Sequence, residues 1–141
     1  ADILIMARTD ARASLGLEEA LWRLQAFVDL GADILFLEAP QDEAEMRTFC
    51  QALPGPKMAN MLEEGVTPLL PPAVLAEMGY KIAAYPLTLL NSAVFAMRET
   101  LDDIRAGRVP ARRVDFATIR QIVGFADYDR LLGHYADESR F

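Results

Sequence analysis

The sequence predicts an α/β fold in which a parallel sheet is built from consecutive strand–helix units. Short apolar runs alternate with longer segments whose apolar residues recur at helical spacing, and this alternation is typical of βα units. The composition agrees, because 52% of the 141 residues are hydrophobic, which is enough to bury a core. We therefore expect a single domain over residues 1–141, with four βα units followed by C-terminal helices.

The first two units lie in the first third of the chain. Residues 3–6 form an apolar run that predicts the first strand. The helix after it has an apolar face formed by Leu17, Leu21, Leu24 and Val28, and Gly31 ends it. Residues 34–37 predict the second strand, and Asp42 with Glu45 forms a capping box at the start of the second helix.

The third unit has a strand at residues 57–61 and a short helix that Pro71 and Pro72 begin and Gly79 ends. The fourth strand is predicted at residues 81–85. The longest helix follows it, with an apolar face of Leu90, Ala93, Val94, Met97, Leu101 and Ile104. One or two further helices are expected from about residue 115 onward.

Four βα units correspond to half of a (β/α)8 TIM barrel, which has eight such units in about 250 residues. An open four-stranded parallel sheet would leave two edges exposed, and natural proteins generally cover or close such edges. The sequence thus predicts half of a barrel, completed by another half or by a second copy.

Charge and hydropathy exclude several classes of partner. The net charge is −7 without a basic cluster, so no nucleic acid partner is expected. No apolar run is long enough to cross a bilayer, so no membrane partner is expected either. The one cysteine, Cys50, cannot form an internal disulfide and falls on an apolar helix face, which fits a core position and a cytoplasmic location.

Polar residues follow the predicted strands at intervals of one βα unit. Arg8, Glu38 and Asn60 are separated by 30 and 22 residues (38 − 8 and 60 − 38). Because functional groups of parallel βα folds gather at the carboxyl ends of the strands, these three side chains should converge on one mouth.

The three residue types suit an anionic substrate. Arg8 offers a forked cationic donor for a carboxylate or enolate oxygen, and Asn60 adds a neutral donor. Two alternatives stay open for Glu38, which is either a charge partner of Arg8 or the group that holds a substrate proton. Glu63 and Glu64, which follow Asn60, are either site residues or loop residues.

Four strings carry a resemblance to a known group of enzymes, and they are ILIMARTDA, DILFLEAP, MANMLEEGVTP and AAYPLTLL. In this order and spacing they resemble the C-terminal half of the isocitrate lyase and phosphoenolpyruvate mutase superfamily. That superfamily includes 2-methylisocitrate lyase, dimethylmalate lyase, oxaloacetate decarboxylase and phosphonate-forming mutases. The resemblance covers nearly the whole chain and implies a (β/α)8 barrel.

The resemblance implies a Mg²⁺-dependent carbon–carbon lyase or decarboxylase that cleaves a bond next to a pyruvate-like unit through an enolate. The substrate would be a small dicarboxylate or 2-oxo acid. Arg8 matches the catalytic arginine at the enolate oxygen, while Glu38 and Asn60 match positions that line the substrate pocket. Leu87 and Thr88, after the fourth strand, are further candidate substrate-binding residues.

Two departures from the family pattern bear on function. Members that cleave methylisocitrate tend to carry an arginine shortly after the turn at residues 85–87, whereas this chain has Asn91 in that region, so a tricarboxylic substrate is disfavoured. The family's magnesium ligands and its mobile loop with a catalytic cysteine belong to the other half of the barrel, so this chain should be incomplete for catalysis. The alternative is a non-catalytic half barrel that binds carboxylates or acts as a scaffold.

The resemblance also implies a homo-oligomer. In the family the last helix is commonly exchanged between neighbouring subunits, which makes residues 118–135 the candidate intersubunit segment. The apolar residues of that segment would equally suit packing on the chain's own barrel.

Overall fold

The computed structural model describes residues 3–138, and side chains as far as residue 135. The chain forms two compact units, Ala1–Ala93 and Val94–Phe141. Each unit is described by itself below. The expectation of a single domain over residues 1–141 stays a prediction.

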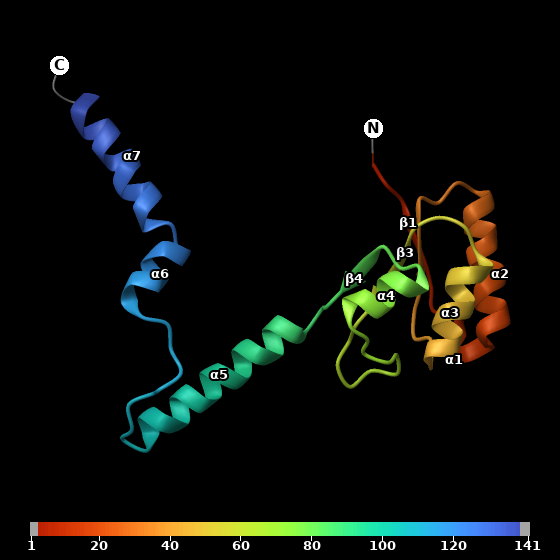
Figure 1. Ribbon diagram of the computed structural model, residues 1–141, viewed down its shortest axis with the longest axis horizontal. Coiled ribbons are helices and arrows are strands. Elements are labelled where there is room, and N and C mark those ends of the chain that lie inside the picture. Colours follow the sequence, from red (N-terminus) through yellow and green to blue (C-terminus); the bar gives the residue numbers. More distant parts are fainter. Residues whose placement is uncertain (1–2, 139–141) are drawn as a thin grey trace. The chain divides into compact units, whose positions relative to one another are not determined.

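The first unit contains a four-stranded parallel sheet (Figure 1). Its strands are β1 (Met6–Thr9), β2 (Ile34–Leu37), β3 (Lys57–Asn60) and β4 (Ile82–Ala84), and they are hydrogen-bonded in the order of the sequence. A helical segment follows each strand, so the prediction of an α/β fold with four βα units is confirmed.

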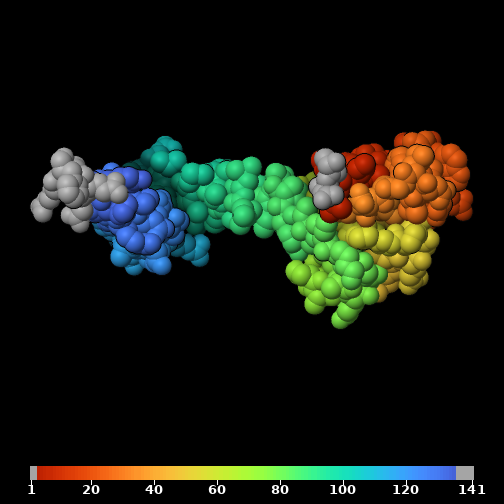
Figure 2. Space-filling model, turned by 90° about the horizontal axis from the view of Figure 1, so that it is seen from above, coloured from red at the N-terminus to blue at the C-terminus, as the bar shows by residue number. Residues whose placement is uncertain are grey.

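Helices cover one face of this sheet and enclose the core. They are α1 (Ala11–Leu15), α2 (Leu17–Asp29), α3 (Glu43–Ala52) and α4 (Pro72–Met78). The core residues come from alternate strand positions and from the helices, and they include Leu24, Leu35, Leu37, Met46, Phe49, Ala59, Met61 and Leu75. In the space-filling view the first unit, from red to yellow-green, forms one continuous body (Figure 2).

The helix ends of this unit follow the sequence signals. The Asp42 side chain accepts a hydrogen bond of 2.8 Å from the backbone N–H of Glu45 at the start of α3, as a capping box predicts. Pro72 is the first residue of α4, and Gly79 ends it with a φ of 113°, a left-handed conformation that favours glycine.

The first strand was predicted three residues too early. Residues 3–6 form the apolar run from which the strand was predicted. Ile3, Leu4 and Ile5 are nevertheless exposed and lie before the residues of β1 that pair with β2. The carbonyl of Ile5 accepts hydrogen bonds from the N–H groups of Asp33 and Ile34, and regular pairing with β2 begins only at Met6. Pairing with β2, rather than hydrophobicity, sets where β1 lies, and Arg8 is therefore inside the strand.

The second unit contains most of α5 (Thr88–Arg105), then α6 (Phe116–Ile122) and α7 (Phe125–Glu138). The expectation of one or two further helices is thus met by two. The apolar face predicted for α5 is not buried, because its members Leu90, Met97 and Leu101 are 57–59% exposed. Within the described part of the chain, no helix combines the length and the apolar character needed to span a bilayer.

Candidate functional site

The strand register places the predicted site residues on one face of the sheet. Arg8 pairs with Phe36, Phe36 with Met58, and Asn60 with Ala84. Directly paired residues of parallel strands point to the same side, and so do residues two apart on one strand. Continuing the β2–β3 register by two residues sets Glu38 opposite Asn60. Arg8, Glu38 and Asn60 therefore share one face.

This face is the one turned away from the helices. The alternate positions Leu35, Leu37 and Ala59 belong to the core that α2, α3 and α4 cover. On the site face Asn60 is only half-buried, and Phe36 is the one strand residue that is closely covered, at 5% exposure. The chemistry-bearing face is thus separate from the core that holds the first unit together.

Arg8 is held from two directions. Its Nε and Nη2 atoms donate to the two carboxylate oxygens of Asp10, at 3.0 and 2.7 Å. Its Cζ atom lies 4.8 Å from the ring centroid of Phe36, an arrangement in which a cation is attracted to the π face. The hydrogen bond with Asp10 raises the pKa of Arg8 and lowers the pKa of Asp10. The guanidinium is therefore permanently charged and has a fixed plane.

Glu38 lies beside this guanidinium. Its Oε2 atom is 3.5 Å from Nη2 of Arg8, and its side chain is 22% exposed. This oxygen is buried and has the contact with Arg8 but no hydrogen bond, which leaves a desolvated acceptor and carries a free-energy cost. The backbone N–H of Glu38 donates to the carbonyl of Thr9 at 3.0 Å, and the next residue, Ala39, has a φ of 55°. The turn out of β2 thus begins immediately after this carboxylate.

The remaining predicted residues lie at the same edge of the sheet. Asn60 ends β3, and none of the described residues forms a hydrogen bond with its side-chain amide. Leu87 is 38% exposed and accepts a backbone hydrogen bond from Asn91 through its carbonyl. Thr88 begins α5, and its hydroxyl donates to Glu63 rather than to any of the three strand-borne residues. The structure thus brings Arg8 and Glu38 together and puts Thr88 with Glu63.

Two residues of this arrangement were missed as site residues in the sequence. Phe36 was assigned only to the second strand, and Asp10 was not among the candidate site residues. The sequence did contain a signal for Phe36. It stands two residues before Glu38, and alternate residues of a strand lie on the same face. The role of Asp10 could not be inferred from the sequence, because two hydrogen bonds to one guanidinium depend on side-chain geometry.

The described residues do not offer a metal centre of their own. No group of three or more His, Cys, Asp or Glu side chains within the described chain is placed to hold a metal ion. Glu38 has an oxygen available, but its neighbour is the cation Arg8, which competes with a metal for the same charge. The local donor set therefore does not fit a magnesium ion.

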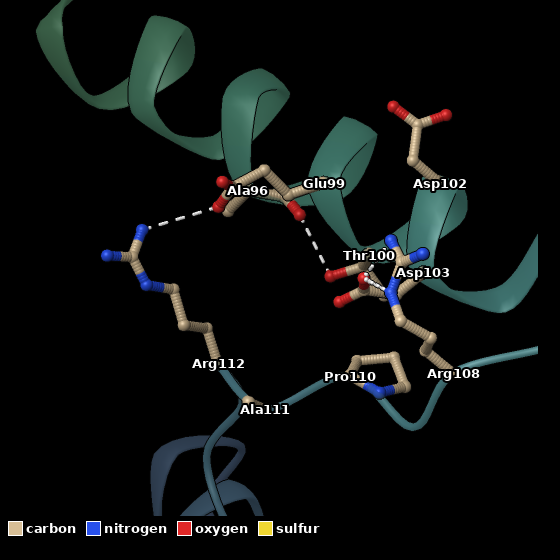
Figure 3. A pocket seen from close by; sticks show the side chains of 9 residues that line it. All are labelled: Ala96, Glu99, Thr100, Asp102, Asp103, Arg108, Pro110, Ala111 and Arg112. Carbon is tan, nitrogen blue, oxygen red and sulfur yellow. Dashed lines mark hydrogen bonds and ion pairs between the residues drawn. The ribbon is translucent and has the colours of Figure 1, made fainter. Parts of the chain in front are cut away.

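A hollow of about 420 Å³ lies in the second unit between α5 and residues 108–112 (Figure 3). Its arginines already have partners in the wall, with Arg108 2.7 Å from Asp103 and Arg112 3.3 Å from Glu99. These pairs are exposed and fasten the loop to the helix. No substrate-binding residue was predicted there. Each arginine of the hollow is paired with an acidic residue, and Asp102 adds one further negative charge to the lining.

The sequence and the fold both match known proteins. Residues 1–105 match the phosphoenolpyruvate phosphomutase family. The chain is 40% identical over 140 residues to 2,3-dimethylmalate lyase from Eubacterium barkeri, covering 96% of this chain and 48% of that protein. It is 36% identical over 133 residues to 2-methylisocitrate lyase from Aeropyrum pernix, covering 92% of this chain and 43% of that protein.

Among solved structures, oxaloacetate acetylhydrolase in complex with the inhibitor 3,3-difluorooxalacetate superposes with a TM-score of 0.86 at 31% identity. That match covers 94% of this chain and 46% of the other. A crystal structure of 2,3-dimethylmalate lyase, a member of the PEP mutase/isocitrate lyase superfamily, gives a TM-score of 0.83 over 96% of this chain. The chain spans less than half the length of these relatives, so its fold is that of about half of such a TIM barrel.

Proposed function

This chain belongs to the phosphoenolpyruvate phosphomutase family, and from that premise we propose that it forms part of a carbon–carbon lyase acting on a small dicarboxylate or 2-oxo acid. The names of its relatives support this class, since two of them are lyases at 40% and 36% identity. A similar structure was solved with an inhibitor derived from oxaloacetate, which is itself a 2-oxo dicarboxylate.

The proposed reaction cleaves a bond next to the 2-oxo group of a pyruvate-like unit. With oxaloacetate the C3–C4 bond breaks, C4 leaves as CO2, and the electron pair left on C3 is delocalised onto the 2-oxo oxygen, which gives an enolate that is then protonated to pyruvate. With a 2-substituted malate the 2-hydroxyl loses its proton, the C2–C3 bond breaks to release the 2-oxo acid, and the electron pair on C3 is delocalised onto the neighbouring carboxylate before protonation. A fixed cation near the oxygen that gains charge stabilises the developing charge without reorganising during the reaction. Arg8 supplies such a cation, because Asp10 and Phe36 fix its plane while Nη1 has no partner among the described residues.

One observation carries this proposal, namely the position of a fixed guanidinium beside an under-partnered carboxylate on the open face of the sheet. Glu38 lies 3.5 Å from Arg8, and its buried Oε2 is free to accept a hydrogen bond from a hydroxyl or an acidic proton of a substrate. Asn60, next along this edge by register, would donate to a substrate carboxylate.

We further propose that Leu87 and Thr88 shape the mouth of the site and that the substrate carries two carboxylates rather than three. Asn91, one turn into α5, is neutral and offers no cation for a third carboxylate. A neutral amide provides a weaker hydrogen bond to a carboxylate than an arginine fork does.

A magnesium cofactor remains part of the proposal, with its ligands outside the described groups, since these do not form a metal site. No step assigned to Arg8, Glu38 or Asn60 uses the ion. Chelation of divalent metals should abolish turnover by the full-length protein, and added Mg²⁺ should restore it. Unchanged turnover after chelation would remove magnesium from the proposal.

The direct test is turnover of oxaloacetate and of 2-substituted malates by the full-length protein, with Mg²⁺ present and pyruvate detected through a coupled assay. Arg8→Ala should abolish activity, because the enolate would lose its cation. Arg23→Ala is the matched control, since this exposed arginine on α2 forms an ion pair with Glu19, away from the site. Absence of turnover of every acid by the wild-type protein would defeat the proposal.

The alternative is a carboxylate-binding protein without catalysis, in which Arg8 holds a carboxylate and no bond is cleaved. Titration calorimetry with oxalate discriminates between the two. Binding of oxalate that depends on Arg8, with no turnover of any acid by the full-length protein, would establish the binding function instead.

We also propose that the protein is a cytoplasmic homo-oligomer in which residues 118–135 contact a neighbouring subunit. The support is the exposure of large apolar side chains in this segment, including Ile122, Tyr128 and Leu131 at 57–67%. Leu131→Glu should then reduce the mass measured by light scattering to that of a smaller assembly. An unchanged mass would contradict this contact.

A further inference from the structure

Two glutamates of the first unit share a pair of features that none of the other described residues has. Buried side-chain oxygens without a hydrogen-bond partner occur at Oε2 of Glu38 and at Oε2 of Glu63. The residues with a left-handed backbone that are not glycine are Ala39, with a φ of 55°, and Glu64, with a φ of 59°. Each of these two directly follows one of the two glutamates.

This coincidence indicates a role in function rather than in stability. A left-handed backbone costs a residue with a Cβ atom about 1–2 kcal/mol, and an unpartnered buried oxygen also has a cost. Such costs persist where the surrounding structure needs the geometry, and they cluster at functional sites. Glu38 is already placed at the candidate site beside Arg8, so the same features draw attention to Glu63.

Glu63 stands at the same edge of the sheet. It lies three residues after the end of β3, while Glu38 follows β2 directly. Both positions are at the carboxyl ends of parallel strands, where βα folds collect their functional groups. Unlike Glu38, Glu63 has no arginine or lysine as an ion-pair partner among the described residues. Its contact is with a hydroxyl, and its role must therefore differ.

The contact of Glu63 crosses from one loop to another. The hydroxyl of Thr88, the first residue of α5, donates to Oε1 of Glu63, 25 residues away in sequence. Nearer the strands, the N–H of Met61 donates to the carbonyl of Ala84 at 2.8 Å. The segment after β3 is thus fastened to the end of β4 by one backbone bond and to the start of α5 by one side-chain bond.

Resting on the function proposed above, we propose that Glu63 is a positioning residue of the substrate site. Its carboxylate holds the turn that carries Leu87 and Thr88 against the loop that begins after Asn60. Oε1 makes the fastening bond, and the half-buried carboxylate stays between the two loops because Glu64 turns the backbone at that point. Glu63 thereby sets where Leu87 and Thr88 lie relative to Asn60, without contact between Glu63 and the reacting atoms.

The test uses the full-length protein and two measurements. Glu63→Ala and Thr88→Val each remove the bond, so each should speed backbone hydrogen exchange in residues 61–70 and 86–93. Each should also raise KM for oxaloacetate about tenfold, the change expected from losing one hydrogen bond to a charged group, with a smaller effect on kcat. Glu63→Gln and Thr88→Ser keep an acceptor and a donor, and they should restore most of the wild-type values.

The double variant Glu63→Ala with Thr88→Val should be no worse than either single variant, because both act through the same bond. Glu77→Gln is the matched control and should change neither measurement, since that side chain is exposed on α4. If Glu63→Ala does not fold, the Thr88 variants and Glu63→Gln still carry the comparison.

The two proposals fail in different ways. If the wild-type protein turns over none of the acids but the exchange pattern is as expected, the proposed function is wrong and the fastening role stands. If the protein is active and Glu63→Ala matches Glu77→Gln in exchange and in KM, the positioning role is overturned. Additive effects of Glu63→Ala and Thr88→Val would overturn it as well.

Discussion

The guanidinium of Arg8 stacks on Phe36, its register partner on the neighbouring strand, with 4.8 Å from Cζ to the ring centroid. Because Asp10 occupies Nε and one proton of Nη2, the ring and the carboxylate together define the plane of the cation. The pairing of β1 with β2 thus brings Phe36 beside Arg8, although the two residues are far apart in the sequence, and fixes the orientation of the guanidinium at the candidate site.

Phe36→Leu should therefore lower kcat/KM for oxaloacetate by about fivefold, because a partly desolvated cation–π contact contributes on the order of 1 kcal/mol. Steady-state kinetics and thermal unfolding of the full-length protein check this. Phe27→Leu is the control, since Phe27 packs on the core from α2. It should lower stability without lowering activity, and equal kinetic losses in both variants would contradict a specific role for Phe36.

Asp10→Asn should reduce activity while leaving stability within about 0.5 kcal/mol of the wild type, because exposed ion pairs contribute little to folding. The two side chains of the pair are 47% and 65% exposed. The kinetic loss should come from the orientation of Arg8, which the amide holds less firmly than the carboxylate does. Urea unfolding and turnover of oxaloacetate measure the two effects, and a stability loss without a kinetic loss would reverse this assignment.

The sequence predicted the ends of a helix or strand correctly where local residues alone determine them. β2 was placed correctly because four apolar residues lie between Asp33 and Glu38. α4 was placed by Pro72 and Gly79, which act through backbone geometry alone. α1 was missed, because five residues without a side-chain cap or an apolar period carry no helix signal.

The sequence predicted only those parts of the candidate site that follow from the regular spacing of the strands. The spacing of Arg8, Glu38 and Asn60 predicts one shared edge, and the register places the three residues on one face. The hydrogen bond between Glu63 and Thr88 joins two loops across 25 residues, and no periodicity encodes such a contact. The spacing of apolar residues also predicted an apolar face on α5, but such spacing does not identify what packs against that face.

Glu45 should stabilise the first unit in a pH-dependent way. Its carboxylate accepts two hydrogen bonds from Arg12, at 2.7 and 2.6 Å, and one from the backbone N–H of Gln41. The bonds from Arg12, above all, lower the pKa of Glu45 below its usual 4.5. The folded state therefore binds fewer protons than the unfolded state as the pH falls, and the contribution of Glu45 is present above pH 4.5 and lost as the pH falls through the lowered pKa.

Glu45→Gln should accordingly lower the free energy of unfolding by about 1 kcal/mol at pH 7, as expected for hydrogen bonds to a charged group on a partly buried side chain. The difference from the wild type should shrink as the pH is lowered below 4.5. Denaturant unfolding at several pH values measures it. Glu43→Gln is the control, because its exposed pair with Arg47 spans 3.8 Å and should matter little.

Ala39 offers a test in which stability and activity should move in opposite directions. Its φ of 55° costs an alanine more than a glycine, by about 1 kcal/mol, while a glycine loses somewhat more backbone entropy on folding. Ala39→Gly should therefore leave the free energy of unfolding unchanged or raise it by about 0.5 kcal/mol. Ala76 lies within α4, where a glycine relieves no left-handed strain. Ala76→Gly should therefore lower the free energy of unfolding by about 1 kcal/mol.

Activity should respond to Ala39→Gly in the other direction. The left-handed turn begins directly after Glu38, whose carboxylate lies 3.5 Å from Arg8, so a freer backbone should let that carboxylate move. A severalfold drop in kcat/KM for oxaloacetate, without loss of stability, would show that the strained turn serves the site. If Ala39→Gly instead destabilises the protein as much as Ala76→Gly does, Ala39 is not left-handed in solution, and the turn has no such role.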